Sequence, residues 1–133
     1  MPMIRVLVNG CFGRMGSEVV RAVSAQDDME AVGGVDVCLG GHDSVSGGEG
    51  NPLAPAFDKL EEALEQIKPD VMVDFTHPSA VEGNIRMGLA VGVDCVVGTT
   101  GLSSEKIEEL GRLVPAGTTL FIAPNFTTGA VLM

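Results

Sequence analysis

The sequence predicts an α/β domain built on a doubly wound parallel sheet. Strand-like apolar runs and segments with apolar residues at helical spacing alternate five times along the chain. Most connections between them are short, and such alternation favours parallel strands joined by right-handed helical crossovers. The chain has 133 residues, the length of one ordinary domain, so a single sheet covered by helices accounts for all of it.

The first strand and its glycine turn form the most informative stretch. Residues 4–8 are a short, mostly branched apolar run, and Gly10, Gly13 and Gly16 follow before a segment with helical spacing begins. A strand, a glycine turn and a helix present unpaired backbone amides and the positive end of the helix dipole to an anion. The spacing is Gly-x-x-Gly-x-x-Gly, not the commoner Gly-x-Gly-x-x-Gly. A purely structural turn is therefore an equal alternative for the motif alone.

A carboxylate at the end of the second strand favours a nucleotide site. Residues 31–35 form the second apolar run, and Asp36 follows it, 20 residues after Gly16. In a Rossmann-type dinucleotide-binding domain, an acid at this place binds the ribose hydroxyls of adenosine. The alternative is a loop acid that caps the next turn. Together, the turn and the acid favour a nicotinamide or flavin dinucleotide.

The remaining elements follow in order. The first helix should end near Ala25, and residues 39–56 are rich in glycine with two prolines, so we expect a flexible loop there. Pro69, Gly92 and Pro115 mark the ends of three further helices. We expect these helices to begin at the capping box Asp58-x-x-Glu61, at the capping box Ser79-x-x-Glu82 and at Ser103, with strands over residues 71–74, 93–97 and 118–122.

The expected strand order indicates which loops surround a ligand. An order of 3-2-1-4-5 would bring the carboxyl ends of strands one, four and five to the switch point, where open α/β sheets bind ligands. Those ends are the glycine turn, residues 98–100 and residues 123–126. Thr99 and Thr100 would hydrogen-bond a ribose or carboxamide, and Phe126 would shield the nicotinamide from water. Turn chemistry and core packing are the alternatives for these three residues.

Charge and cysteine content exclude several classes of partner. With 18 acidic and 8 basic residues the net charge is −10, which opposes nucleic acids and anionic membranes. No apolar stretch reaches the roughly 18 residues of a membrane span, and a signal peptide is not evident, so we expect a cytoplasmic protein. The three cysteines show no Cys-x-x-Cys spacing and there are only two histidines, so no metal site is expected. Cys11 is expected to fill space as a reduced thiol.

Four motifs together resemble the 4-hydroxy-tetrahydrodipicolinate reductase family, also called dihydrodipicolinate reductase. They are Asn-Gly-Cys-Phe-Gly-Arg-Met-Gly at 9–16, Val-Asp-Phe-Thr-His-Pro at 73–78, Val-Gly-Thr-Thr-Gly at 97–101 and the segment from Ala-Pro-Asn-Phe at 123–133. They occur in the family's order and span the chain. The resemblance implies a cytoplasmic oxidoreductase of lysine and diaminopimelate biosynthesis that reduces a cyclic imine dicarboxylate with NADH or NADPH.

The resemblance also assigns cofactor-binding residues to this chain. The glycine turn would hold the pyrophosphate, Asp36 the adenosine ribose, and the later motifs the nicotinamide and its ribose. The implied set is Gly10, Cys11, Phe12, Gly13, Arg14, Met15, Asp36, Phe75, Thr76, Gly98, Thr99, Thr100, Ala123, Pro124, Asn125 and Phe126.

In that family the catalytic groups belong to a second domain, which we expect to be missing from this sequence. We therefore expect a cofactor-binding portion that binds a dinucleotide but does not turn over, with dicarboxylate binding and homo-oligomer assembly belonging to the intact protein. Val37 follows Asp36 and leaves Arg14 as the only local base in the sequence. We therefore expect NADH to be preferred, because a carboxylate with no basic residue beside it in the sequence repels a 2′-phosphate. Another amino-acid dehydrogenase and a non-catalytic dinucleotide sensor are the alternatives.

Overall fold

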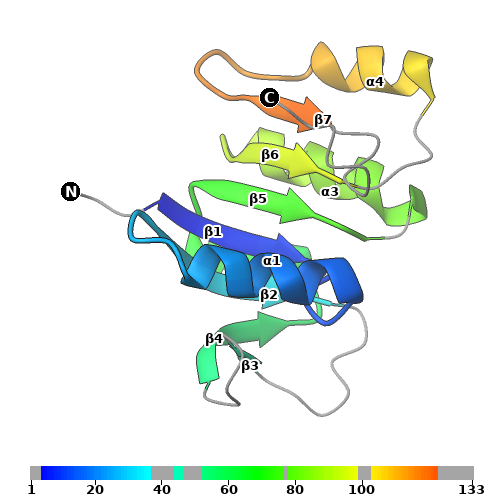
Figure 1. Ribbon diagram of the computed structural model, residues 1–133. Helices are drawn as coiled ribbons and strands as arrows, with labels where there is room; N and C mark the ends of the chain where they lie inside the picture. The colour runs from blue at the N-terminus through cyan, green and yellow to red at the C-terminus, as the bar shows by residue number, and fades with distance from the viewer. Residues whose placement is uncertain (1–3, 37–43, 47–51, 77, 99–102, 123–133) are drawn as a thin grey trace.

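A computed structural model describes residues 4–36, 44–46, 52–76, 78–98 and 103–122. Strands form one seven-stranded sheet in the order β3-β4-β2-β1-β5-β6-β7, in which every neighbouring pair is parallel except β3 with β4 (Figure 1). The strands are β1 (Ile4–Asn9), β2 (Met29–Val35), β3 (Ser44–Ser46), β4 (Pro52–Phe57), β5 (Val71–Asp74), β6 (Asp94–Val97) and β7 (Leu120–Ile122). The helices are α1 (Arg14–Ser24), α2 (Leu60–Ile67), α3 (Pro78–Ala90) and α4 (Ser104–Gly111).

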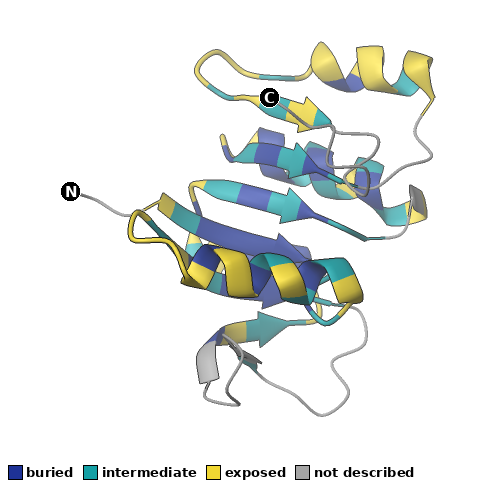
Figure 2. Cartoon of the chain, in the orientation of Figure 1, coloured by how far each residue is buried: buried dark blue, intermediate teal, exposed yellow. Residues whose placement is uncertain are grey.

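Helices cover the two faces of the sheet unequally. The apolar side chains of α1 pack with alternate residues of β1 on one face, where Val20 and Val23 meet Val6 and Val8. The larger core lies on the other face, where residues of α2, α3 and α4 pack against Leu7 and the inward residues of β5 and β6. Figure 2 shows the buried residues concentrated in the central strands and on the helix sides that face them. The predicted doubly wound parallel sheet is confirmed.

The segment 39–56, which we expected to be a loop, contains two strands. Residues 44–46 form β3 and residues 52–57 form β4, while residues 37–43 and 47–51 lie outside the described part of the chain. Proline lacks a backbone N–H donor, so its presence argues against a strand. Pro52, however, occupies the first position of β4, where the missing donor is tolerated. The loop prediction was therefore wrong for β3 and β4.

The missed strand β4 also corrects the strand order. We expected residues 71–74 to be the third strand, beside the second, but they pair with β1. It is β4 that pairs with β2, at Gly34–Ala56 and Val35–Phe57. Counting the parallel strands along the chain, the order is 3-2-1-4-5-6, the doubly wound pattern with one more strand than we counted.

Two of the expected helix starts differ from the structure. The N-cap of α2 is Lys59, which makes no side-chain cap bond, instead of Asp58. Ser79 lies inside α3 and is therefore not the residue that precedes the helix. The Glu82 carboxylate pairs with Arg86, four positions later, and with Lys106. Ser103 does cap α4 as expected, since its side chain accepts a hydrogen bond from the Lys106 amide. No helix in the described ranges is both long and apolar enough to cross a membrane.

Candidate nucleotide-binding site

A cavity of about 500 Å³ lies at the carboxyl edge of the sheet, where β1, β2 and β5 end and α2 and α3 begin. This is the switch point between β1 and β5, the place where open α/β sheets bind ligands. The cavity brings together five residues of the implied cofactor set, Gly10, Gly13, Asp36, Phe75 and Thr76. Its other lining residues are Asn9, Val35, Asp58, Lys59, Leu60, Glu61, Ser79, Ala80, Asn84 and Met87.

Close backbone packing explains two of the three glycines. Gly10 has a φ of +79°, and a β-carbon there would lie 3.1 Å from the Phe75 carbonyl oxygen. At Gly16 a β-carbon would lie 1.9 Å from the Gly10 carbonyl oxygen, so helix α1 can approach the turn only without a side chain. Gly13 has no such obstacle, with its nearest atom, Gly10 O, at 3.4 Å. Its missing side chain instead leaves the exposed side of the turn open toward the cavity.

The N-terminus of α1 offers unsatisfied amides at this turn. Gly13 is the N-cap and has no side chain to cap the helix, and the first turn of α1 contains no acidic residue. The Gly13 amide itself donates to Gly10 O at 3.0 Å, which closes the turn. An uncapped helix start of this kind favours a bound anion, through both its amides and its dipole.

Asp36 is fixed beside the same turn. Its Oδ2 accepts a hydrogen bond from the Phe12 amide at 3.0 Å, and its own amide donates to the Phe57 carbonyl at 3.0 Å. These contacts hold the carboxylate at the edge of the cavity between the glycine turn and the end of β4. The carboxylate is therefore placed where a nucleotide whose phosphates meet the amides of α1 would carry its ribose.

The charged residues around Asp36 differ from the sequence-based expectation. Arg14 does not line the cavity, whereas Lys59 does. Asp58 and Glu61 line it as well, so the described lining contains three acidic residues and one basic residue. Lys59 comes from the start of α2, 23 positions after Asp36, and no local motif pointed to it.

Asp74 forms the buried floor behind the cavity. The side chain is fully buried, and its Oδ2 accepts hydrogen bonds from Asn9 Nδ2 at 3.1 Å and Asn84 Nδ2 at 2.9 Å. Its Oδ1 accepts from the Thr76 amide at 2.9 Å and the Thr76 hydroxyl at 2.6 Å. Asn9 and Asn84 are site residues that the sequence reasoning missed. The signal for Asn9 was an amide directly after the apolar run 6–8, because a buried polar group requires a partner.

Cys11 lies behind the turn as a packed thiol. It is 2% exposed, and burial, together with the nearby Asp36 charge, raises its pKa to about 12. A thiol with this pKa holds its proton at neutral pH and is a poor nucleophile. This agrees with the expected role as a space-filling residue. Among the described residues there is no group of three metal-ligating side chains.

The other implied residues lie outside the cavity lining or outside the described part of the chain. Arg14 and Met15 open α1. Gly98 follows β6, and its amide donates to the Asp74 carbonyl at 2.9 Å, which places it one strand away from the cavity. The predictions for Thr99, Thr100, Ala123, Pro124, Asn125 and Phe126 fall on residues outside the described ranges.

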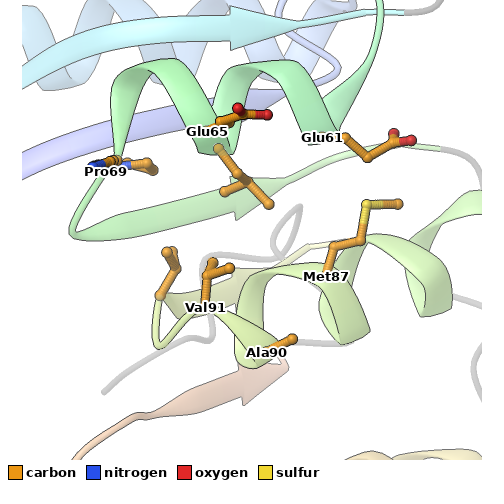
Figure 3. Close-up of a pocket in the computed structure, with 9 residues that line it drawn as sticks. Glu61, Glu65, Pro69, Met87, Ala90 and Val91 are labelled. Carbon is orange, nitrogen blue, oxygen red and sulfur yellow. The ribbon is translucent and has the colours of Figure 1, made fainter.

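A second, larger cavity of about 630 Å³ lies between α2 and α3. Figure 3 shows Pro69, Ala90 and Val91 on its apolar walls, with Glu61 and Glu65 on the α2 side. It shares Glu61 and Met87 with the first cavity but contains neither the glycine turn nor Asp36. The smaller cavity therefore has the chemistry of a nucleotide site.

Comparisons with known proteins agree in pointing to one family. The family model described as dihydrodipicolinate reductase, N-terminus, matches residues 4–126. The 4-hydroxy-tetrahydrodipicolinate reductase of Gloeothece citriformis is 45% identical over 98% of this chain and 50% of its own length. The enzyme of the same name from Syntrophomonas wolfei is 42% identical over 97% of this chain and 49% of its own. This chain thus spans about half the length of the curated relatives it matches.

A solved structure shows the same relationship in three dimensions. The dipicolinate-bound dihydrodipicolinate reductase from Paenisporosarcina sp. TG-14 superposes with a TM-score of 0.80 at 35% identity. The match covers 96% of this chain and 49% of that protein.

Proposed function

Because the chain belongs to the dihydrodipicolinate reductase family, whose N-terminal part it matches, we propose that it binds the nicotinamide dinucleotide of a reductase. The observation that carries the proposal is the meeting of the glycine turn and Asp36 in one cavity at the switch point. A turn that excludes side chains at Gly10 and Gly16 fits the close approach of a pyrophosphate.

Each part of the site has a distinct task in this proposal. The amides at the start of α1 hold the pyrophosphate, and the Asp36 carboxylate accepts hydrogen bonds from the ribose hydroxyls. Phe75 and Thr76 form the wall next to Gly10. The family resemblance assigns the nicotinamide end of the cofactor to the sequence motifs at 97–101 and 123–126. The cofactor, when bound, supplies a hydride. The chain's own residues orient it.

We propose that the longer reductase reduces a cyclic imine dicarboxylate with NADH or NADPH in the cytoplasm, and that dicarboxylate binding and homo-oligomer assembly require the half of the relatives beyond this chain. The family resemblance supports this, and the reduced thiols of Cys11 and Cys95 fit a cytoplasmic location. The expected result for the 133-residue chain is cofactor binding without steady-state turnover. Turnover at the rate of an intact reductase would contradict this part of the proposal.

The charges around the ribose support a preference for NADH over NADPH. Among the described residues, the cavity lining contains the acidic Asp36, Asp58 and Glu61 and the basic Lys59, and this net negative charge opposes a 2′-phosphate. Two like charges about 4 Å apart repel by roughly 4 kcal/mol at an effective dielectric constant of about 20. Even after screening by solvent and by Lys59, NADH should bind at least about tenfold more tightly.

Titration of the chain with each reduced cofactor, followed by cofactor fluorescence, tests binding and preference together. Asp36→Ala should weaken NADH binding and reduce the difference between the affinities for NADH and NADPH. Asp70→Ala, at the opposite edge of the sheet, serves as the matched control and should leave both affinities unchanged. A folded chain that binds neither cofactor would refute the proposed function, and equal or tighter binding of NADPH would refute the preference alone.

A further inference from the structure

We propose that Asp74 is a positioning residue that sets the width of the crevice between the glycine turn and the Phe75–Thr76 wall. The inference rests on the proposed function, because it assigns a role in holding the cofactor. Asp74 is too deeply buried to touch a ligand itself, with 0% of its surface exposed. Its effect on the cofactor must therefore pass through the residues that it holds.

The carboxylate of Asp74 joins three separate segments. Asn9 reaches it from the end of β1, Thr76 from the turn after β5, and Asn84 from the second turn of α3. Each contact lies between 2.6 and 3.1 Å, and hydrogen bonds to a charged acceptor are among the stronger ones in proteins. The arrangement locks the start of α3 and the Phe75–Thr76 turn to the end of β1.

Backbone contacts make the same residue a junction of strand ends. The Phe75 amide donates to the Asn9 carbonyl at 3.1 Å, and the Gly98 amide donates to the Asp74 carbonyl at 2.9 Å. The ends of β1, β5 and β6 thus meet around Asp74 at the carboxyl edge of the sheet. A change in the side-chain contacts of Asp74 is transmitted directly to Phe75.

The position of Phe75 determines the space left at the glycine turn. Its carbonyl oxygen lies so close to Gly10 that a β-carbon there would be at 3.1 Å. A shift of Phe75 toward the turn would close the crevice, and a shift away would loosen the wall against which the cofactor packs. Substrate and cofactor sites lose affinity when such support is displaced by as little as about 1 Å.

The network is not arranged for stability alone. Asn9 is fully buried, and its Oδ1 has no hydrogen-bond partner among the described residues. Turning the amide over would bring that oxygen toward the Asp74 carboxylate, so Asp74 dictates the orientation of Asn9 at the expense of one unsatisfied acceptor. Buried polar groups that are retained despite such a cost can instead specify one geometry.

Exchanging the carboxylate and the amide across the Asp74–Asn84 contact tests the positioning role. Asn84→Asp brings two carboxylates together across the 2.9 Å contact, and we expect the Kd for NADH to rise by about tenfold or more. Adding Asp74→Asn reverses the donor and acceptor across the same contact. The oxygen of the introduced amide can still accept from Thr76, and Asn9 can turn its unpartnered oxygen to accept from the nitrogen of that amide. The double variant should therefore recover most of the affinity.

Controls separate positioning from charge and from folding. Gln66→Glu adds the same charge on the exposed side of α2 and should leave the Kd unchanged. Asn84→Ala removes one arm of the network without any change of charge and should also weaken binding. Far-UV circular dichroism and the unfolding midpoint are measured for every variant.

The outcomes are distinct. If the double variant binds no better than Asn84→Asp, the loss comes from negative charge on the cavity wall, and the positioning role is wrong. Wild-type affinity in Asn84→Ala would overturn the positioning role as well. Because Asn84→Ala introduces no charge, it also tests that role if Asn84→Asp fails to fold. Failure of the unaltered chain to bind NADH would contradict the proposed function instead.

Discussion

Replacing Gly16 with alanine tests whether close packing of α1 on the glycine turn is required. A β-carbon at this position would lie 1.9 Å from Gly10 O, 2.7 Å from Gly10 C and 3.1 Å from Cys11 Cα. All three atoms belong to the backbone, so rotation of a side chain cannot relieve the clash. Either the helix or the turn must move until the 1.9 Å approach reaches an ordinary contact distance.

The expected magnitude follows from two opposing terms. Alanine in a helix is favoured over glycine by about 1 kcal/mol, whereas overpacking of a tight site costs about 1–3 kcal/mol or more. A backbone obstacle on this scale belongs at the upper end, so Gly16→Ala should lower the free energy of unfolding by about 2 kcal/mol. That corresponds to roughly 5–10 °C in the melting temperature. Because the turn itself shifts, NADH affinity should fall as well.

Gly83 provides the matched control. It lies within α3, is exposed, and a β-carbon there would meet nothing within 4 Å. Gly83→Ala should therefore raise stability by about 0.5–1 kcal/mol through helix propensity alone. Urea unfolding followed by far-UV circular dichroism measures both variants. A Gly16→Ala chain as stable as the unaltered one, with unchanged NADH affinity, would refute the packing argument.

Two further predictions concern the buried thiols and the sheet edge. Burial raises the pKa of Cys11 and Cys95 to about 12 from the 9.0 of a free thiol, so the unfolded chain loses these protons first as the pH rises. The stability contributed by the protonated thiols is complete below pH 9.0 and declines as the pH rises toward about 12. The urea midpoint should therefore fall more steeply above about pH 9 than it does in a Cys11→Ala/Cys95→Ala variant, and parallel curves for the two chains would contradict this. Phe121 is 45% exposed on the edge strand β7. We expect Phe121→Ser to reduce self-association in analytical ultracentrifugation, because it removes an exposed apolar side chain. Unchanged self-association would count against an apolar contact between chains at Phe121.

Elements with a strong local signal could be predicted from the sequence. The strand over residues 71–74 was placed at its observed bounds, and the first helix ends within one residue of Ala25. Ser103 caps α4 as expected. In each case neighbouring residues carry the whole signal, either as an apolar run or as a hydroxyl group before a helix.

Elements that depend on distant partners were not predictable in the same way. The strand β4 is stabilised by pairing with β2 and β3, while its own prolines and the glycines before it are typical of a loop. Asp58 could not be excluded as a cap without knowing that the chain stays extended through Lys59.

The candidate site was predictable in part for a similar reason. Gly10 and Asp36 belong to a motif with fixed spacing, whereas Lys59 and Asn84 enter the cavity only because α2 and α3 return to the same edge. Asp74 was not among the predicted site residues, and its burial depends on donors 65 positions before it and 10 after it. Such contacts are properties of the topology and leave no local pattern.

The pairing of β1 with β2 has a consequence for how nucleotide motifs are searched. Val6 pairs with Ala31 but Leu7 pairs with Gly33, so Val32 is an extra residue in β2. After this irregularity, each residue of β1 pairs with a residue of β2 that is one position later in the sequence than uninterrupted pairing would give. A related protein without the extra residue would carry the acid at the end of β2 one position nearer to the glycines in sequence, at the same point in space. Search patterns that demand a single interval between glycines and acid would overlook such proteins.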